Sequence, residues 1–380
     1  MSFALYTIAS PLHKGLPDVL AEQFIIDVQS ALGEDFEFFG DDFSTYGSRE
    51  VSVIYVRTGG TEGIFRALSL SGEVRLLTSG RSNSLAAAME ILAYVRSRGG
   101  RGEILHGPAA GIAERLRRPL EVRGGGSWLM PLPELDLGGA RLGVIGRPSD
   151  WLIASDVDYS LAASRLGVEL VDIDIDELVA AVGEVGCPDL RSFAGSEAVH
   201  TALCELVRRY RLDGLTLRCF DLLDSVGNTG CLALARLNAS GIPAACEGDI
   251  PALLTMMVAR RLTGCPGFQV NLSRISGDEL LFAHCTVPLS MVSSYSYDTH
   301  FESGIGTAIR GVLPLGNVTL FKIAPDLGSM VCIPARLVRN QSEPGLCRTQ
   351  VVVEAPGAAD YFMGSTLANH HVIVPGDIVF

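Results

Sequence analysis

The chain has 380 residues, of which 48% are hydrophobic and 19% are charged, so it is long enough for two or three domains with large buried cores. Its net charge of −13, without a cluster of Lys and Arg between aromatic residues, excludes a typical nucleic-acid-binding surface. The nine cysteines are odd in number and form no CxxC pair, which is typical of a reducing compartment and not of a disulfide framework.

The N-terminal segment does not have the basic region that precedes the apolar core of a signal peptide. Apolar runs in the sequence stay shorter than about 18 residues, the length that a membrane span needs. We therefore expect a cytoplasmic protein that interacts with neither membranes nor nucleic acids.

Residues 1–135 are predicted to form an N-terminal α/β domain that ends in a Gly- and Pro-rich linker. The segment VSVIYV at 51–56 is β-branched and apolar, as in a buried parallel strand. Its loop TGGTEG at 58–63 has neither the GxGxxG nor the GxxxxGK[ST] spacing, so it predicts no nucleotide site. The other elements expected here are strands at 3–8 and 74–77 and helices at 17–32 and 84–98.

Residues 136–285 are predicted to form a second α/β domain, because apolar strands alternate there with helical segments. Alternation of this kind is typical of a doubly wound, Rossmann-like parallel sheet with right-handed crossovers. The expected strands are 140–145, 168–173, 215–220, 242–246, 268–270 and 280–284. The expected helices are 157–166, 197–210, 232–238 and 250–262.

The pattern changes in residues 286–380, where helical periodicity largely disappears. Short β-type runs such as NVTLFKI and RTQVVVE are separated by Gly, Pro and Asn, which favours an antiparallel, barrel-like β domain. The sequence thus predicts an α/β protein with two doubly wound Rossmann-like domains, followed by a C-terminal antiparallel β domain.

Two consecutive strand ends in the second domain carry polar side chains. Glu247 and Asp249 follow the strand at 242–246, and Asn271 follows the strand at 268–270. Because ligands bind beyond the carboxyl ends of strands in an open parallel sheet, we expect these residues in one crevice. Carboxylates at i and i+2 can share a divalent cation, or one can act as an acid or base beside it. Asp249 equally fits the N-cap of the following helix.

Three histidines are further candidates. His370 and His371 begin the last strand-like run, and because neighbours on a strand point to opposite faces, at most one of them faces a shared site. His284 ends an apolar strand and is expected at the same sheet edge as Glu247. The adjacent Cys285 is either a nucleophile with a nearby histidine or, as we favour, a buried structural thiol.

Four side chains are candidates for substrate contacts. Arg218 lies in an apolar strand and needs a partner, for which Glu247 or an anionic or hydroxyl-rich ligand is suited. Trp151 either stacks on a ligand or packs between domains. His300 and Glu302 belong to the polar loop THFESGIG, which either touches a ligand or stabilises a turn.

Four segments resemble the L-fucose isomerase family, over roughly residues 140–380: GRPSDWL, CEGDI…LTG, AHCTVPL…HFESG and NHHVIVPGD. The resemblance implies a divalent ion, usually manganese, held by a Glu, an Asp and a His. It assigns the Glu to Glu247 and the His to His370, in the segment Ala-Asn-His. The Asp would come 24 residues after the Glu, at the position of Asn271.

Asn271 departs from the pattern of that family. An Asn can bind a metal through its carbonyl oxygen, but it is uncharged and cannot act as a base. In the ene-diol mechanism that the resemblance implies, the metal polarises the substrate oxygens while two carboxylates move protons between C1 and C2. Asp249 and Glu302 are the available replacements for the missing carboxylate.

The sequence and this resemblance together predict a carbohydrate isomerase that interconverts aldoses and ketoses and depends on Mn²⁺ or another divalent cation. The alternative, which Asn271 favours, is a catalytically silent or divergent sugar-binding or regulatory protein on the same scaffold. The resemblance also implies a homo-oligomer, a trimer or hexamer, with each active site completed by a neighbour's N-terminal domain. The predicted catalytic residues are Glu247, Asp249 and Asn271, the metal ligands are Glu247, Asn271 and His370, and the substrate contacts are Trp151, Arg218, His284, His300 and Glu302.

Overall fold

The computed structural model describes residues 1–11, 13–70, 72–121 and 128–378. A first parallel sheet has the strand order β2-β1-β3-β4-β5. Its strands are β1 (Phe3–Ile8), β2 (Glu37–Gly40), β3 (Val51–Val56), β4 (Glu73–Thr78) and β5 (Arg101–Leu105). The associated helices are α1 (Gln23–Leu32), α2 (Glu62–Leu68), α3 (Ser84–Ser97) and α4 (Ala109–Leu116), with short 3-10 turns η1 (Val19–Ala21) and η2 (Phe43–Thr45). We call this part the first α/β unit.

A second parallel sheet has the order β10-β9-β7-β8. Its strands are β7 (Arg141–Ile145), β8 (Glu169–Ile173), β9 (Gly214–Leu217) and β10 (Ala244–Cys246). Its helices are α5 (Tyr159–Leu166), α6 (Ile175–Val185), α7 (Phe193–Tyr210), α8 (Asp221–Ser225), α9 (Cys231–Ala239) and α10 (Ile250–Thr263). We call this part the second α/β unit.

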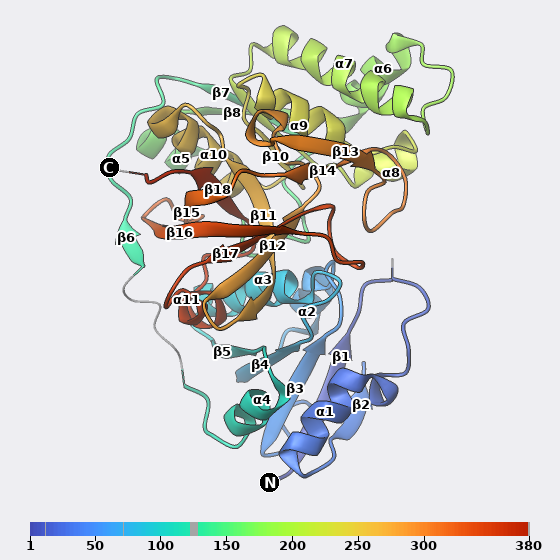
Figure 1. The fold of residues 1–380 in the computed structure, drawn as a ribbon, viewed down its shortest axis with the longest axis vertical. Coiled ribbons are helices and arrows are strands. Elements are labelled where there is room, and N and C mark those ends of the chain that lie inside the picture. Colours follow the sequence, from blue (N-terminus) through green and yellow to red (C-terminus); the bar gives the residue numbers. More distant parts are fainter. Residues whose placement is uncertain (12, 71, 122–127, 379–380) are drawn as a thin grey trace.

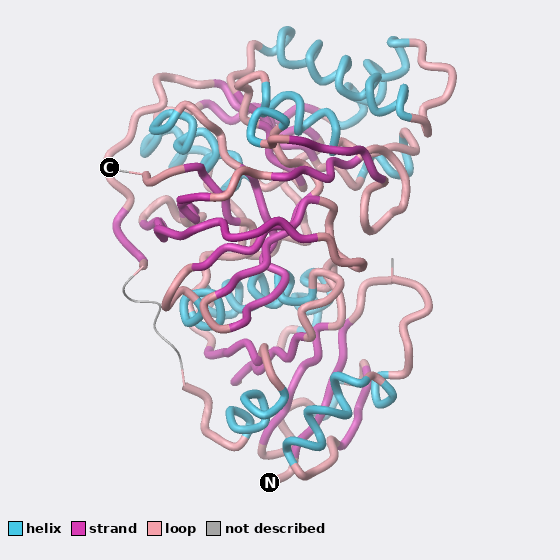
Figure 2. Tube along the Cα trace, in the orientation of Figure 1, coloured by secondary structure: helices cyan, strands magenta, loops and turns pink. Residues whose placement is uncertain are grey.

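The remaining strands form a closed antiparallel barrel in the order β15-β18-β11-β12-β17-β16, since β16 pairs back onto β15. They are β11 (Phe268–Ser276), β12 (Glu279–His284), β15 (Gly316–Ile323), β16 (Ser329–Gln341), β17 (Thr349–Glu354) and β18 (His371–Pro375). Attached to the barrel are β6 (Leu129–Pro131), which pairs with β16, the hairpin β13 (Ser294–Asp298)–β14 (Ala308–Val312), the turn η3 (Leu289–Met291) and α11 (Ala359–Gly364). Figure 1 shows the barrel between the two α/β units, and Figure 2 shows the same strands in magenta.

The structure corrects the expected positions of two strands. The strands at 268–270 and 280–284 were expected in the second parallel sheet, but they lie in β11 and β12 of the barrel and pair antiparallel. Only Gly277 and Asp278 separate the paired residues Ser276 and Glu279, and Gly277 has a φ of 61°. A two-residue turn joins antiparallel strands, whereas parallel neighbours need a crossover of about a dozen residues.

The predicted parallel sheets and the antiparallel barrel are confirmed. The doubly wound, Rossmann-like character and the boundaries at 135 and 285 stay predictions. Among the described residues, the helices are too short or too polar to cross a membrane.

Two helices join the barrel to the sheets. Helix α3 contacts β4 and β5 on one side and β11 on the other, so its residues are buried around most of its circumference. Side chains of α3 such as Leu92 share one hydrophobic core with Ile54 of the first sheet and Phe282 of the barrel. Helix α10 likewise packs against β9 and β10 and against β15 and β18. The first α/β unit is therefore packed firmly against the barrel that carries the candidate site residues.

Candidate functional site

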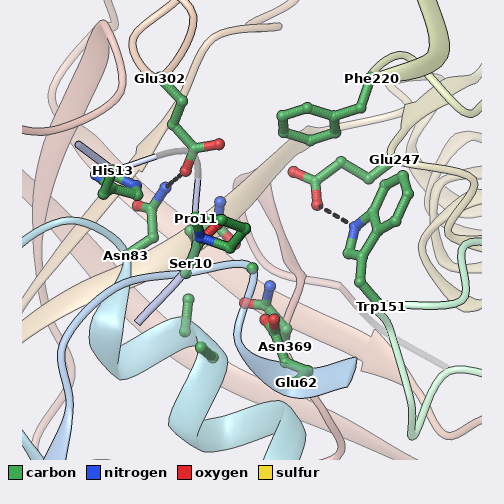
Figure 3. A pocket seen from close by; sticks show the side chains of 15 residues that line it. Ser10, Pro11, His13, Glu62, Asn83, Trp151, Phe220, Glu247, Glu302 and Asn369 are labelled. Carbon is green, nitrogen blue, oxygen red and sulfur yellow. Dashed lines mark hydrogen bonds between the residues drawn. The ribbon is translucent and has the colours of Figure 1, made fainter. Parts of the chain in front are cut away.

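A pocket of about 300 Å³ lies where the carboxyl ends of both parallel sheets meet the barrel. Strand order reverses between β1 and β3 in the first sheet and between β7 and β9 in the second, and ligands bind at such reversals. The lining residues are Ser10, Pro11, His13, Gly59, Gly60, Glu62, Asn83, Ala86, Ala87, Trp151, Phe220, Glu247, Asn271, Glu302 and Asn369. Figure 3 shows Trp151, Phe220 and Glu247 on one side of the pocket and His13, Asn83 and Glu302 on the other.

Glu247 enters the pocket directly after β10, from a tightly held backbone turn. Its φ is 64°, a left-handed conformation that non-glycine residues adopt at a cost and that clusters at functional sites. The hydroxyl of Ser149 donates to the Glu247 carbonyl, and a Cβ on the following Gly248 would lie 2.9 Å from the Arg147 carbonyl oxygen. The Trp151 indole N–H donates to Glu247 Oε2 at 3.4 Å. These contacts fix the direction of the carboxylate.

Two histidine rings face the other oxygen of Glu247. His284 Nε2 lies 3.6 Å and His370 Nε2 lies 3.5 Å from Glu247 Oε1, and both rings are buried. Neither Nε2 atom has a hydrogen-bond partner in the described part of the chain. The Nδ1 atoms are held from behind, His284 by Thr286 Oγ1 at 3.0 Å and His370 by Asp249 Oδ2 at 2.8 Å. Both rings are therefore oriented with Nε2 toward the pocket.

Asn271 completes a set of candidate metal ligands on or next to three neighbouring strands. It lies on β11, between β12, which ends at His284, and β18, which begins next to His370. It is 4% exposed, and its Oδ1 has no partner in the described residues. A buried polar atom without a partner is costly. Asn271 Oδ1, His284 Nε2 and His370 Nε2 beside the Glu247 carboxylate therefore fit a divalent cation, which binds N and O ligands. Ligand atoms of Glu247 and His284 also lie within 4.8 Å of Cys246 Sγ, but that sulfur is 3.2 Å from Cys219 Sγ.

The charges around Glu247 and His370 are strongly coupled. Burial alone would raise the pKa of Glu247, but the charge of His370 and the proximity of the His284 and His370 rings hold it well below its usual range. Burial alone would lower the pKa of His370, but Glu247 and Asp249 raise it to about 10. Without a cation the two groups form an ion pair, so a divalent ion that binds here would displace the proton on His370 Nε2.

Two other carboxyl groups in the pocket wall have a raised pKa, in contrast to Glu247. Burial raises the pKa of Glu62 to about 8, and the neighbouring carboxylates add to this shift. Burial also raises the pKa of Glu302, whose Oε1 accepts a hydrogen bond of 2.8 Å from Asn83 Nδ2. The pocket therefore holds one firmly ionised carboxylate and two that are readily protonated, which suits proton transfer.

The structure brings four of the predicted site residues into the pocket wall: Trp151, Glu247, Asn271 and Glu302. Asp249 lies fully buried behind His370, where its Oδ1 also caps α10 by accepting from Ala252 N at 2.7 Å. It thus serves as the expected N-cap and orients a histidine at the same time. His371 turns away from the pocket and contacts Tyr361 Oη at 2.8 Å.

Arg218 and His300 stand one layer behind the lining residues. The Arg218 guanidinium lies 4.6 Å from the Trp151 ring centre and pairs with Asp150 and Asp221, each at 3.0 Å. It therefore pairs with these two aspartates and not with Glu247, which the sequence had offered as a partner. The His300 ring packs edge-on against Phe220 at 5.8 Å. Both residues support the aromatic side chains of the pocket. Cys285 is 2% exposed in a cluster with Cys231 and Cys347, which supports a structural thiol.

The first α/β unit contributes more to the pocket than its sequence indicated. Ser10 follows β1, Glu62 follows β3, and Asn83 follows β4, all at carboxyl ends of the first sheet. Oε2 of Glu62 and Oδ1 of Asn83 have no partner in the described residues. The rule applied to the second sheet, that polar residues after strands line a crevice, would have indicated the loop TGGTEG as well.

The sequence is similar to two curated proteins. It is 26% identical over 196 residues to a sulfoquinovose isomerase of Clostridium sp. (strain MSTE9), a match that covers 47% of this chain and 43% of that protein. It is 26% identical over 132 residues to a sulfoquinovose isomerase of Alkalicoccus urumqiensis, covering 32% of this chain and 30% of the relative. The chain thus matches less than half the length of these relatives. No protein-family model matches the chain.

Proposed function

We propose that this protein is a divalent-metal-dependent sugar isomerase that interconverts an aldose and a ketose. The proposal rests on His284 Nε2, His370 Nε2 and Asn271 Oδ1, three buried polar atoms that have no hydrogen-bond partner among the described residues and line or adjoin the pocket beside Glu247. The similarity to two sulfoquinovose isomerases supports the reaction class. Glu247, His370 and His284 would hold the ion, and the Asn271 carbonyl would be a weaker, uncharged ligand.

The bound ion would polarise the carbonyl and hydroxyl oxygens at C1 and C2 of the sugar. The chain itself must move a proton between these two carbons. Glu302 is suited to this role because it lines the pocket, Asn83 fixes one of its oxygens, and its pKa is raised by burial. Asp249 cannot reach the pocket, since both of its oxygens are engaged with Ala252 N and His370 Nδ1.

The charge of the pocket indicates the kind of sugar. The described lining residues include Glu62, Glu247 and Glu302 and neither Lys nor Arg. A sulfonate or phosphate group placed among them would have no Lys or Arg partner in the described lining, whereas sugar hydroxyls can donate to the oxygens of Glu62 and Asn83 that have no partner among the described residues. Trp151 and Phe220 offer apolar faces to the C–H side of a sugar ring. We therefore propose a hydroxyl-rich sugar without an acidic group as the substrate.

The test combines metal binding with isotope exchange. Mn²⁺ titrated into the purified protein should bind by calorimetry and raise the melting temperature, and a panel of neutral aldoses in D₂O should take up deuterium at C2. The same panel with sulfonated and phosphorylated sugars should show weaker exchange. The proposal is wrong if none of Mn²⁺, Co²⁺ and Zn²⁺ binds.

Asn271 favours a second function, a silent sugar-binding or regulatory protein, because this position carries no charge. Sugar binding by calorimetry without any deuterium exchange would support that function. The variant Asn271→Asp separates the two, since an added carboxylate should strengthen Mn²⁺ binding by about tenfold or more. If exchange then appears only in this variant, the natural chain is the silent form.

A further inference from the structure

A buried carboxylate of the first α/β unit contacts the segment that carries His370. Glu90 lies on α3, is fully buried, and is not among the pocket-lining residues. Its Oε2 accepts a hydrogen bond of 2.9 Å from the backbone N–H of Asn369. A carboxyl group buried so deeply is costly unless hydrogen-bond donors surround it, so these hydrogen bonds are needed to keep Glu90 in the interface.

The same carboxylate also holds the loop that carries Trp151. Oε1 of Glu90 accepts from Ala154 N at 2.7 Å and from Ser155 Oγ at 3.1 Å. One side chain of the first unit is thus bonded to two segments that lie 215 positions apart in sequence, Ala154 and Asn369. These segments place the two groups that contact Glu247 from either side, the Trp151 indole and the His370 ring.

The backbone at His370 is held at several points. Lys322 Nζ donates to the His370 carbonyl at 2.7 Å, and Asp249 binds the His370 ring. Ala368, two residues earlier, has a φ of 72°, so the chain turns sharply before Asn369. The Asn369 N–H, in contrast, is held from outside the barrel, because it donates to Glu90 of the first α/β unit.

We propose that Glu90 is a positioning residue that couples the docking of the first α/β unit to cation binding at Glu247 and His370. The inference rests on the proposed function, because it concerns the same cation site. Coupling of this kind is reciprocal: if the docked unit improves the cation site, a bound cation must stabilise the docked unit. Groups behind metal ligands typically change metal affinity by about 10- to 100-fold when they are altered.

The test uses Glu90→Gln, which keeps the shape of the side chain but leaves its NH₂ group facing one of the two backbone N–H donors. The matched control is Arg96→Met on the same helix, which removes the contact of Arg96 with the Gly364 carbonyl across the same interface. Calorimetric titration with Mn²⁺ should show about tenfold or greater loss of affinity for Glu90→Gln. Arg96→Met should lower the melting temperature and leave Mn²⁺ affinity unchanged.

A second variant, Glu90→Asp, keeps the carboxyl group on a side chain one methylene shorter, which should reach only one of the two segments, and its Mn²⁺ affinity should be intermediate. It replaces Glu90→Gln as the test if that variant does not fold. The inference is overturned if the Glu90 variants lose melting temperature to the same extent as Arg96→Met and bind Mn²⁺ like the natural chain. If the natural chain itself binds no Mn²⁺, the proposed function fails and the inference fails with it, a result that is distinct from the previous one.

Discussion

The two α/β units point the carboxyl ends of their parallel strands into one pocket, yet they supply it with different groups. The second unit supplies Glu247, held ionised and aimed by Ser149 and Trp151. The first unit supplies Glu62 and Asn83, whose oxygens lack partners in the described residues. The same topological position thus carries a proposed cation ligand in one unit and hydrogen-bond acceptors in the other. Each unit can be tested by changing its own residue.

The largest effect is expected for Glu247→Gln in the second unit. Without the charge, the orphaned nitrogens of His284 and His370 no longer adjoin an anion, and we expect Mn²⁺ binding to disappear and kcat/KM to fall by about 1,000-fold or more. Calorimetry and the deuterium-exchange assay measure both. Glu279→Gln, at an exposed barrel pair with Arg339, is the control and should behave like the natural chain.

A smaller effect, confined to the chemical step, is expected for Glu302→Gln. This residue meets the first unit through Asn83, and a Gln keeps that contact while losing the ability to move protons. We expect kcat to fall by about 100-fold with Mn²⁺ affinity unchanged. A fall in Mn²⁺ affinity instead of kcat would place Glu302 among the ligands and contradict its role as acid and base.

Glu62→Gln tests the first unit through stability and pH. The folded-state pKa of Glu62 is about 8, above its ordinary value of 4.5, so the folded protein holds a proton that the unfolded chain releases between these values. The natural chain should therefore lose stability as pH rises from 4.5 to 8, while the neutral variant should lose less. Urea unfolding of both proteins at pH 5 and pH 8 measures this difference. Equal pH dependence would show that Glu62 ionises normally.

The smallest effect is expected at the contact between the first unit and the barrel. His106 Nε2 accepts from Ile275 N at 3.1 Å and His106 Nδ1 contacts Thr78 Oγ1 at 2.8 Å, while burial, and then the charge of Arg274, lower its pKa from 6.5 to about 4. Because the unfolded chain binds the proton more readily, this contact should lose roughly 1–3 kcal/mol as pH falls from 6.5 to 4. His106→Gln should remove that pH dependence in urea unfolding, and an unchanged slope would contradict the assignment.

Local sequence patterns indicated much of this arrangement but not its long-range contacts. The apolar strand before Glu247, and the family resemblance at the Ala-Asn-His segment, led to Glu247 and His370, which lie 3.5 Å apart beside the pocket. The turn at Gly277 was missed because a buried antiparallel strand and a buried parallel strand carry the same apolar residues. Glu90 could not be found at all, since its partner Asn369 is 279 residues away and an isolated Glu in an apolar helix carries no spacing signal.

The closed barrel has a consequence for how such a site can evolve. Asn271 lies within β11, His284 ends β12 and His370 directly precedes β18, and these three strands are neighbours in the barrel. Backbone hydrogen bonds set the distance between neighbouring strands at about 4.8 Å, and the closed barrel leaves them no free edge. The loops after β1, β3, β4 and β7, in contrast, come from separate sheets and can lengthen or change without moving those three side chains. The loops around the pocket can therefore change while the three proposed ligand side chains keep their positions.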